Sequence, residues 1–380
     1  MLFFLAATAL VLAVAGCGYL LAAMALVRRA DGVAVADASA NAPGVSILKP
    51  LSGDEPGLLE NLASFCAQDY GGQVQIIFGV QDPADAAVAV VERLRGVYAG
   101  RDLALAVESA AHGVNRKVTN LINMAPRIAH DVVVVADSDI RVEPGYLARV
   151  VATLDRPAVG AVTCLYYGVP RGAANAARPV LGARLSALAI NAHFLPGIVV
   201  GLALGRAQPC FGSTIALRRA ALHAIGGFAA FANCIADDYA IGRELRAQGF
   251  AIAIPPFAVA HVCSEASLRE LWQHELRWAR TIRSIDPAGY AGSLIAHPLP
   301  LALIAALLGA GSVLLVPALA IAGIAILARI ALLRRIAQAY TLPPQAYWLV
   351  PVRDLLSFAI FVASFFGRDV TWRGHSYRIP

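Results

Sequence analysis

The stretch Asp131-Val132-Val133-Val134-Val135-Ala136-Asp137-Ser138-Asp139 predicts a buried strand that runs into two carboxylates. Four consecutive valines favour a strand over a helix, because β-branched side chains pack well on a pleated surface. A strand that is apolar at every position is typical of a sheet covered on both faces. We therefore expect the central strand of a parallel sheet here.

Asp137 and Asp139 follow this strand two residues apart, so they project to the same side of an extended chain. Open parallel sheets bind ligands at the carboxyl ends of their strands. Two oxygen ligands at such an edge suit Mg²⁺ or Mn²⁺ together with a phosphate-bearing substrate. The alternative reading of these residues alone is a solvated turn that merely ends the strand.

The composition of the 380-residue chain favours a membrane protein with one large domain or two. Hydrophobic residues make up 58% and charged residues 15%, whereas soluble proteins have about half and about a quarter. The mean hydropathy is +0.65. The net charge of +6 is spread over scattered arginines, so we expect attraction to anionic lipid and no nucleic-acid partner. The six cysteines lack metal-ligand spacing and are expected to be reduced thiols of a cytosol-facing protein.

An apolar segment at the start of the chain predicts a transmembrane anchor. Residues 1–27 carry no charge, and Arg28-Arg29 follow at once. The segment is long enough to cross about 30 Å of hydrocarbon, and the arginines place its C-terminal end in the cytoplasm. A cleaved signal peptide would carry its positive charge before the apolar run. Residues 28–44 are expected to form a linker.

Further membrane segments are expected at residues 291–367, followed by a basic tail at residues 368–380. Residues 295–329 are almost purely apolar and predict two closely spaced spans. Residues 347–366 predict either a further span or a re-entrant helix, because Arg353-Asp354 lie within them.

Residues 45–290 predict a cytoplasmic α/β domain with a mostly parallel sheet, because strand-like and helix-like segments alternate. Strands are expected at residues 45–48, 74–80, 103–107, 131–135, 159–165, 210–217 and 250–259. Residues 185–204 resemble a span, but Asn191, His193 and Pro196-Gly197 interrupt them. We expect an interfacial or buried helix pair there, since a span would carry the following polar motifs away from the metal site.

Polar motifs recur in a fixed order along this domain: Asp82, then Asp137-Ser138-Asp139, then Asp237-Asp238, then His274-Glu275-Leu276-Arg277-Trp278. Singly they have simpler readings, such as a turn aspartate before Pro83 or carboxylates that favour a helix dipole. In this order they resemble the inverting glycosyltransferases of the GT-A fold, whose pattern is D, DxD, [ED]D and [QR]xxRW. His274 stands where that pattern has Gln or Arg.

The chain resembles still more closely the glucosylceramide synthase-like branch, in glycosyltransferase families 21 and 2. That branch includes the bacterial glycosyltransferases of hopanoid biosynthesis, and the wording of the motifs favours this subgroup. The motifs that carry the resemblance, besides Asp137-Ser138-Asp139 and the His-Glu-Leu-Arg-Trp motif, are Leu48-Lys49-Pro50-Leu51-Ser52-Gly53, Phe78-Gly79-Val80-Gln81-Asp82, Gly113-Val114-Asn115-Arg116-Lys117 and Ala236-Asp237-Asp238-Tyr239.

The resemblance implies a UDP-sugar donor site. Asp82 would accept hydrogen bonds from the uracil and ribose, and Lys117 would neutralise phosphate. Asp137 and Asp139 would hold the divalent cation, Mg²⁺ or Mn²⁺. His261 is a candidate additional ligand or hydrogen-bond donor.

The resemblance also implies an acceptor site. Asp238 would be the general base that takes the proton of the acceptor hydroxyl, with Asp237 near the nucleotide or metal. Arg277 and Trp278 would contact the diphosphate and the acceptor. His274, like His261, is a candidate additional ligand or hydrogen-bond donor, and we expect it to bind the nucleotide sugar.

These inferences predict an integral enzyme of the bacterial inner membrane with its catalytic domain in the cytoplasm. It would transfer glucose or N-acetylglucosamine from a UDP-sugar to the hydroxyl of a hopanoid-type or ceramide-type lipid, with inversion. A processive polysaccharide synthase is the alternative enzyme, although it usually has a fuller [QR]xxRW motif and more spans. A membrane transporter would fit the composition, but the polar residues cluster outside the spans. The oligomeric state stays open.

Overall fold

The computed structural model describes residues 1–27, 42–172, 179–367, 369–372 and 375–378. Most of the expected linker, residues 28–41, lies outside the described residues. The chain divides into two compact units. The helical unit combines Met1–Arg29, Gly168–Ala207 and Cys263–Pro380, and the sheet unit combines Ala30–Tyr167 and Gln208–Val262. The expected domain of residues 45–290 therefore contributes residues 168–207 and 263–290 to the helical unit.

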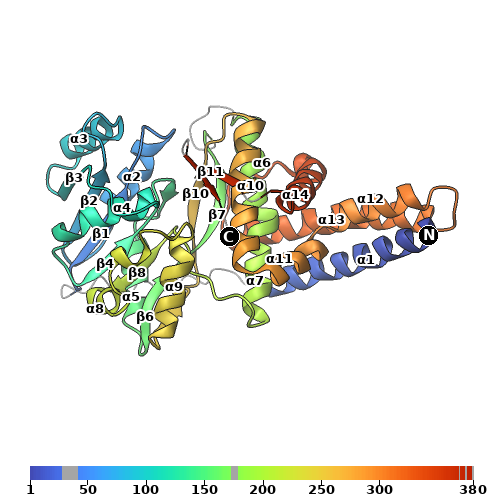
Figure 1. Cartoon of the computed structure of the whole chain (residues 1–380), viewed down its shortest axis with the longest axis horizontal. Helices are drawn as coiled ribbons and strands as arrows, with labels where there is room; N and C mark the ends of the chain where they lie inside the picture. The colour runs from blue at the N-terminus through green and yellow to red at the C-terminus, as the bar shows by residue number, and fades with distance from the viewer. Residues whose placement is uncertain (28–41, 173–178, 368, 373–374, 379–380) are drawn as a thin grey trace. The chain divides into compact units, whose positions relative to one another are not determined.

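A seven-stranded sheet with the order β3-β2-β1-β4-β8-β6-β9 forms the centre of the sheet unit (Figure 1). Its strands are β1 (Val45–Pro50), β2 (Val74–Val80), β3 (Asp102–Val107), β4 (Val132–Val135), β6 (Val159–Thr163), β8 (Ile215–Arg218) and β9 (Ala251–Ala253). Strands β1 to β4 pair in parallel, and so do β6 and β9, whereas β8 is antiparallel to both neighbours. The prediction of a mostly parallel sheet is confirmed.

The expected last strand, residues 250–259, is instead two strands, β9 and β10 (Ala258–Cys263). Pro255-Pro256 separate them, because proline has no N–H to donate to a sheet ladder. Strand β10 belongs to a second sheet with the order β5-β10-β7, in which β5 is Ile140–Arg141 and β7 is Leu165–Pro170.

Strand β4 is buried on both faces, as its valines predicted, and all four are at most 2% exposed. Val132 and Val134 face a core that α2 (Leu58–Cys66), α3 (Ala87–Val97) and α5 (Tyr146–Leu154) cover. Val133 and Val135 face the opposite core, covered by α4 (Arg116–Met124), the 3₁₀ turn η3 (Phe228–Phe231), α8 (Arg219–Ala224) and α9 (Asp237–Ala247). Because both faces of β4 are covered, a ligand can approach this strand only at the edge of the sheet where the strand ends.

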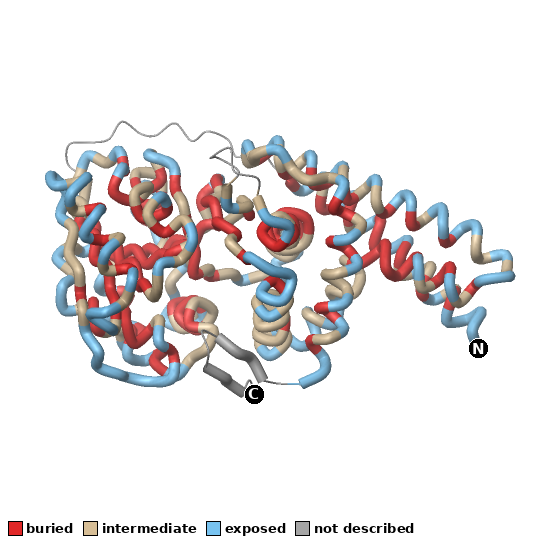
Figure 2. Tube along the Cα trace, turned by 90° about the horizontal axis from the view of Figure 1, so that it is seen from above, coloured by how far each residue is buried: buried red, intermediate tan, exposed pale blue. Residues whose placement is uncertain are grey.

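Within the described residues, four helices of the helical unit are long and apolar enough to cross a membrane: α1 (Leu2–Leu26), the continuous helix Leu181–Ala203, α13 (Leu315–Ala339) and Tyr347–Ser364. The last includes η5 (Tyr347–Leu349) and α14 (Val350–Ser364). Helices α1, α12 (Pro298–Leu308) and α13 lie side by side and bury small side chains between them (Figure 1). Exposed residues recur along these helices (Figure 2), and they include Val11, Leu307 and Leu319. Such exposed apolar side chains fit a membrane protein.

The remaining elements of the helical unit are α10 (Leu268–Ile285), α11 (Pro287–Gly292), η4 (Ser293–Ala296) and the antiparallel pair β11 (Asp369–Trp372) and β12 (His375–Arg378). The segments Pro287–Ala296 and Pro298–Leu308 meet at a bend of 70°. If this bent pair crosses a membrane as a single span, it is a fifth candidate span.

One membrane segment differs from the expectation. Residues 185–204 are expected as a helix pair, but α6 (Leu181–Ala189), the π-helical turn η2 (Ile190–Phe194) and α7 (Leu195–Ala203) form one continuous helix. The two spans expected in residues 295–329 stay a prediction, since α12 has 11 residues and is a candidate span only as part of the bent pair. One polar side chain contacts both regions.

Arg329, fully buried in α13, makes that contact. Pro196 has no N–H, so the Ala192 carbonyl four residues earlier lacks its helical donor. Arg329 Nη1 donates to this carbonyl at 2.7 Å, and Nη2 donates to the Ala296 carbonyl at the bend before α12. Its Nε lies 3.2 Å from Asp354 Oδ1 on α14. The Arg329 guanidinium thus donates hydrogen bonds to main-chain oxygens at two helix irregularities and pairs with a buried carboxylate.

We expect Arg329→Met to lower the free energy of unfolding by about 3–5 kcal/mol, because it leaves the buried Asp354 without its arginine and with only the His193 hydrogen bond. Thermal unfolding in detergent measures the loss. The matched control is Arg334→Met, an exposed arginine on the same helix over the Tyr347 ring, which should cost about 1 kcal/mol or less. Equal unfolding temperatures for the two variants would contradict this role of Arg329.

Candidate active site

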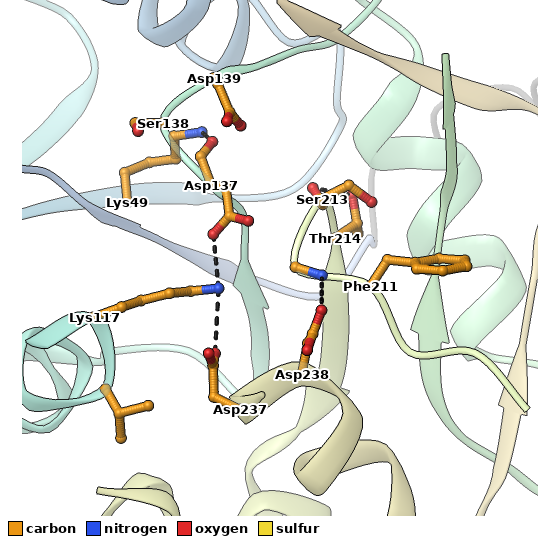
Figure 3. Close-up of polar contacts among 12 residues, drawn as sticks. Lys49, Lys117, Asp137, Ser138, Asp139, Phe211, Ser213, Thr214, Asp237 and Asp238 are labelled. Carbon is orange, nitrogen blue, oxygen red and sulfur yellow. Dashed lines mark hydrogen bonds and ion pairs between the residues drawn. The ribbon is translucent and has the colours of Figure 1, made fainter. Parts of the chain in front are cut away.

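Three of the predicted motifs meet at the carboxyl end of β4 (Figure 3). Lys117 of α4 lies between two carboxylates: its Nζ is 2.7 Å from Asp137 Oδ1 and 3.2 Å from Asp237 Oδ2. Asn115 caps α4 by accepting the Val118 N–H, and its Nδ2 donates to Asp237 Oδ1 at 3.2 Å. Lys117 in the first turn of α4 and its N-cap residue Asn115 thus hold Asp237 close to Asp137.

Asp238 joins the group through a glycine. Its Oδ2 accepts the Gly212 N–H at 3.1 Å, and its Oδ1 accepts the Tyr239 N–H at 2.8 Å. The Gly212 carbonyl in turn accepts the Asp137 N–H at 3.1 Å. A Cβ at position 212 would lie 2.5 Å from Asp137 Oδ2 and 3.0 Å from Lys117 Nζ. Only glycine fits there without displacing the ion pair.

The clustered charges shift one another's ionisation. Burial lowers the pKa of Lys117 by itself, but Asp137, Asp237 and Asp238 together raise it well above its usual value. Burial raises the pKa of Asp137, although Lys117 opposes that shift. Burial and the charge of Asp237 raise the pKa of Asp238 to about 6, against the influence of Lys117. Lys117 therefore stays protonated, while Asp238 is ionised at neutral pH and close to accepting a proton.

Side chains behind the cluster fix the loop after β4. Lys49, at the end of β1, is fully buried and donates to the main-chain oxygen of Asp137. Its Nζ lies 3.9 Å from the centroid of the Phe65 ring, and burial lowers its pKa to about 7. Ser138 donates to Glu55 Oε2 at 2.6 Å. The sequence placed Lys49 in a motif without assigning it a role; its signal was a charged residue closing an apolar strand.

Asp139 meets the chemical demands of a cation ligand. Its Oδ1 is buried, has no hydrogen-bond partner among the described residues, and lies 3.6 Å from His261 Nδ1. In the described part of the chain, no three His, Cys, Asp or Glu residues group to hold a metal by themselves. Mg²⁺ commonly takes one or two carboxylates and completes its shell with phosphate and water. Asp137 and Asp139 fit a divalent cation bound in that way.

Asp82 makes a local turn instead of joining the ion pairs. Its exposed carboxylate accepts the Ala84 N–H at 2.8 Å. Asp82 follows β2, which lies with β4 on either side of β1 in the sheet. Because these strands are parallel, Asp82 and Asp137 leave the sheet at the same edge, where ligands bind in such folds.

The other predicted site residues lie on α10 of the helical unit. His274 Nδ1 is 2.7 Å from Glu265 Oε1, and the His274 ring packs edge-on against Trp278 with centroids 4.5 Å apart. Arg277 lies on the same helix and is partly buried. The predicted residues form two sets, one at the end of β4 in the sheet unit and one on α10 in the helical unit. Sequence reasoning missed Glu265, which lies outside every motif.

A mixed sheet with an acidic cluster at the carboxyl end of β4 places the chain among α/β proteins with a charged site at the sheet's edge. Residues 8–380 match the family described as glycosyl transferase family 21, and the chain belongs to this family. The predicted resemblance to that family is thereby confirmed, while the hopanoid-associated subgroup stays a prediction.

Two similar proteins are ceramide glucosyltransferases 3 and 1 of Caenorhabditis elegans. The first is 27% identical over 239 residues, 63% of this chain and 50% of that protein. The second is 24% identical over 241 residues, 63% of this chain and 49% of that protein. The chain thus spans about half the length of the curated relatives it matches.

A mannosyltransferase from Pyrobaculum calidifontis, solved with GDP-Man and Mn²⁺, has a similar structure. The TM-score is 0.51 at 21% identity, and the match covers 96% of this chain and 99% of that one. This likeness confirms the predicted GT-A type of fold.

We expect Gly212→Ala to weaken UDP binding at least tenfold, since its Cβ would push Asp137 away from Lys117. Isothermal titration with UDP and Mn²⁺ measures the affinity. The control is Gly96→Ala in α3, where an added Cβ meets nothing within 4 Å, and its affinity should equal that of the wild type. An unchanged affinity in Gly212→Ala would show that the ion pair has no part in binding UDP.

Proposed function

We propose that the protein is a membrane-bound inverting glycosyltransferase that moves one sugar from a UDP-sugar to the hydroxyl of a membrane lipid. The sugar is glucose or N-acetylglucosamine, and the lipid is of the hopanoid or ceramide type. The observation that carries the proposal is the meeting of Lys117, Asp137, Asp237 and Asp238 at the end of β4, in a chain of glycosyl transferase family 21. The relatives' names support a lipid acceptor.

The donor is proposed to bind at the carboxyl edge of the sheet. Asp82 binds the uracil and ribose, and Lys117 neutralises a phosphate oxygen. A divalent cation, Mg²⁺ or Mn²⁺, held by Asp137 and Asp139 would supply positive charge to the departing diphosphate. The buried Oδ1 of Asp139, which has no hydrogen-bond partner among the described residues, supports this assignment.

Asp238 is proposed as the general base. It removes the proton of the acceptor hydroxyl while that oxygen attacks the anomeric carbon, opposite the departing UDP, so the configuration inverts. A pKa near 6 suits this work, because the carboxylate is ionised at neutral pH yet more basic than an ordinary aspartate. Asp237 pairs with Lys117 and accepts a hydrogen bond from Asn115. Its proposed place is near the nucleotide.

Three residues of α10 have proposed roles in substrate binding. Arg277 and Trp278 contact the diphosphate and the acceptor, and His274 binds the nucleotide sugar. The four apolar helices are proposed to keep the lipid tail in the bilayer. Arg28-Arg29 after α1 and Arg334-Arg335 near the end of α13 favour the cytoplasmic side of a bacterial inner membrane, where UDP-sugars are available.

Transfer of radiolabel tests the proposal. Purified protein in nanodiscs with Mn²⁺ should move label from UDP-glucose or UDP-N-acetylglucosamine into the organic phase when hopanoid or ceramide is supplied. Asp238→Asn should slow transfer about 10²- to 10⁴-fold and still bind UDP. The control is Asp131→Asn, an exposed carboxylate at the opposite end of β4, which should transfer at the wild-type rate.

The product that carries the radiolabel distinguishes the alternative functions. Label in an insoluble polymer would indicate the polysaccharide synthase. No label in any product would refute the glycosyltransferase proposal. Full activity of Asp238→Asn would remove Asp238 from the role of base.

The raised pKa of Asp238 also predicts a pH profile. A base acts only when deprotonated, so kcat/KM should be level above about pH 7 and fall as the pH drops through about 6. Initial rates at acceptor concentrations well below KM from pH 5 to pH 8 measure this. Asp131→Asn should follow the same curve, and a kcat/KM that rises on acidification would contradict the assignment.

A further inference from the structure

Asn61 is a buried amide of α2, at 2% exposure, that belongs to none of the predicted motifs. Its Nδ2 donates to the main-chain oxygen of Ser138 at 3.2 Å. Its Oδ1 accepts two hydrogen bonds from Arg141 of β5, from Nε at 3.2 Å and from Nη2 at 3.0 Å. Asn61 therefore joins the middle residue of the Asp137-Ser138-Asp139 motif to the short strand that follows the motif.

The Arg141 guanidinium fixes the orientation of the Asn61 amide. A guanidinium only donates hydrogen bonds, so the atom that faces it must be the amide oxygen. The NH₂ group of Asn61 then points to the Ser138 oxygen, which only accepts. An amide turned the other way would satisfy neither neighbour. Arg141 thus makes Asn61 a donor to the motif.

Each of the three main-chain oxygens in the motif accepts a hydrogen bond from a different element. In the order of the motif, the donors are the Lys49 ammonium of β1, the Asn61 amide of α2 and the Val262 N–H of β10. The peptide group between Ser138 and Asp139 is planar, so its oxygen cannot turn without moving the residue that follows. By holding this oxygen, Asn61 sets the direction in which Asp139 leaves the chain.

The direction of Asp139 matters because its carboxylate is held less directly than that of Asp137. Asp137 Oδ1 pairs with Lys117 at 2.7 Å. Asp139 Oδ1 is buried, has no hydrogen-bond partner among the described residues, and lies 3.6 Å from His261 Nδ1. The place of this oxygen therefore depends on the main chain behind it.

We propose that Asn61 is a positioning residue of the cation site, which aims the Asp139 carboxylate at the divalent cation by holding the Ser138 oxygen. The inference rests on the proposed function, which supplies the cation. Asn61, Arg141 and the motif all belong to the sheet unit. A side chain that touches neither cation nor substrate would thereby set the affinity for the cation.

Titration of Mn²⁺ into the protein in nanodiscs with UDP tests the proposal, with the electron paramagnetic resonance signal of free Mn²⁺ as the readout. Asn61→Leu keeps the approximate shape of the side chain but donates nothing, so the Kd for Mn²⁺ should rise about 10- to 100-fold. Asp137 and Asp139 remain in this variant, so excess Mn²⁺ should restore the rate of sugar transfer.

The matched control is Gln68→Met, two residues beyond the end of α2. Gln68 is also 2% exposed. Its Nε2 donates to the main-chain oxygen of Glu143 at 3.0 Å, and its Oε1 accepts the Leu147 N–H at 2.9 Å. Gln68→Met therefore removes a buried amide of the same kind that does not bond to the motif. Its unfolding temperature should fall as in Asn61→Leu, while its Kd for Mn²⁺ should equal that of the wild type.

The outcomes separate this proposal from the proposed function. A wild type that binds no Mn²⁺ in the presence of UDP would refute the cation site and the role of Asn61 together. A wild type that binds Mn²⁺ but transfers no sugar would refute the function, while the comparison of Kd values would still decide the role of Asn61. Equal Kd values for Asn61→Leu and Gln68→Met would overturn the positioning role alone.

If Asn61→Leu does not fold, Asn61→Asp decides. It keeps an oxygen for Arg141 but places a second oxygen, in place of the donor, against the Ser138 carbonyl. The added negative charge would by itself tighten Mn²⁺ binding, so weaker binding identifies the lost donor as the cause. We expect a higher Kd for Mn²⁺ than in the wild type. A Kd equal to or below the wild-type value would overturn the positioning role.

Discussion

The ammonium of Lys117 between Asp137 and Asp237 is the interaction on which the site depends. The end of β4 and the start of α9 bring three aspartates together, and like charges this close repel unless a cation lies among them. Lys117 offsets that repulsion, and Asn115 holds Asp237 in place. Burial, and after it the charge of Asp237, raise the pKa of Asp238. Burial within the acidic cluster is thus the source of its proposed basicity.

The same rule, that each buried charge has a partner, shapes the helical unit. Arg353-Asp354 were an obstacle to a span in the sequence, but each has a partner from another helix. Asp354 pairs with Arg329 of α13, and Arg353 pairs with Glu275 of α10. Paired charges are tolerated within apolar helices where lone ones are not. The motif helix α10 is therefore tied to α14 through the residue next to His274.

Much of this arrangement was predictable because it is local or ordered along the chain. The valine run predicted a strand buried on both faces, and the order of acidic motifs predicted the family. What escaped prediction depends on partners far apart in sequence. Arg329 donates to the Ala192 carbonyl, 137 residues away in the sequence, and so replaces the N–H that Pro196 lacks within a continuous helix. Glu265 meets Ser186 across 79 residues. Periodicity shows which face of a helix is buried but not which side chain meets it.

A single displacement at the end of β4, with Asp238 as the base, requires inversion at the anomeric carbon. The anomeric configuration of the glycolipid product, read from the proton coupling constant in NMR, tests this most directly. UDP-glucose and UDP-N-acetylglucosamine are α-linked, so a single displacement predicts a β-linked product. An α-linked product would show retention and contradict the proposed mechanism.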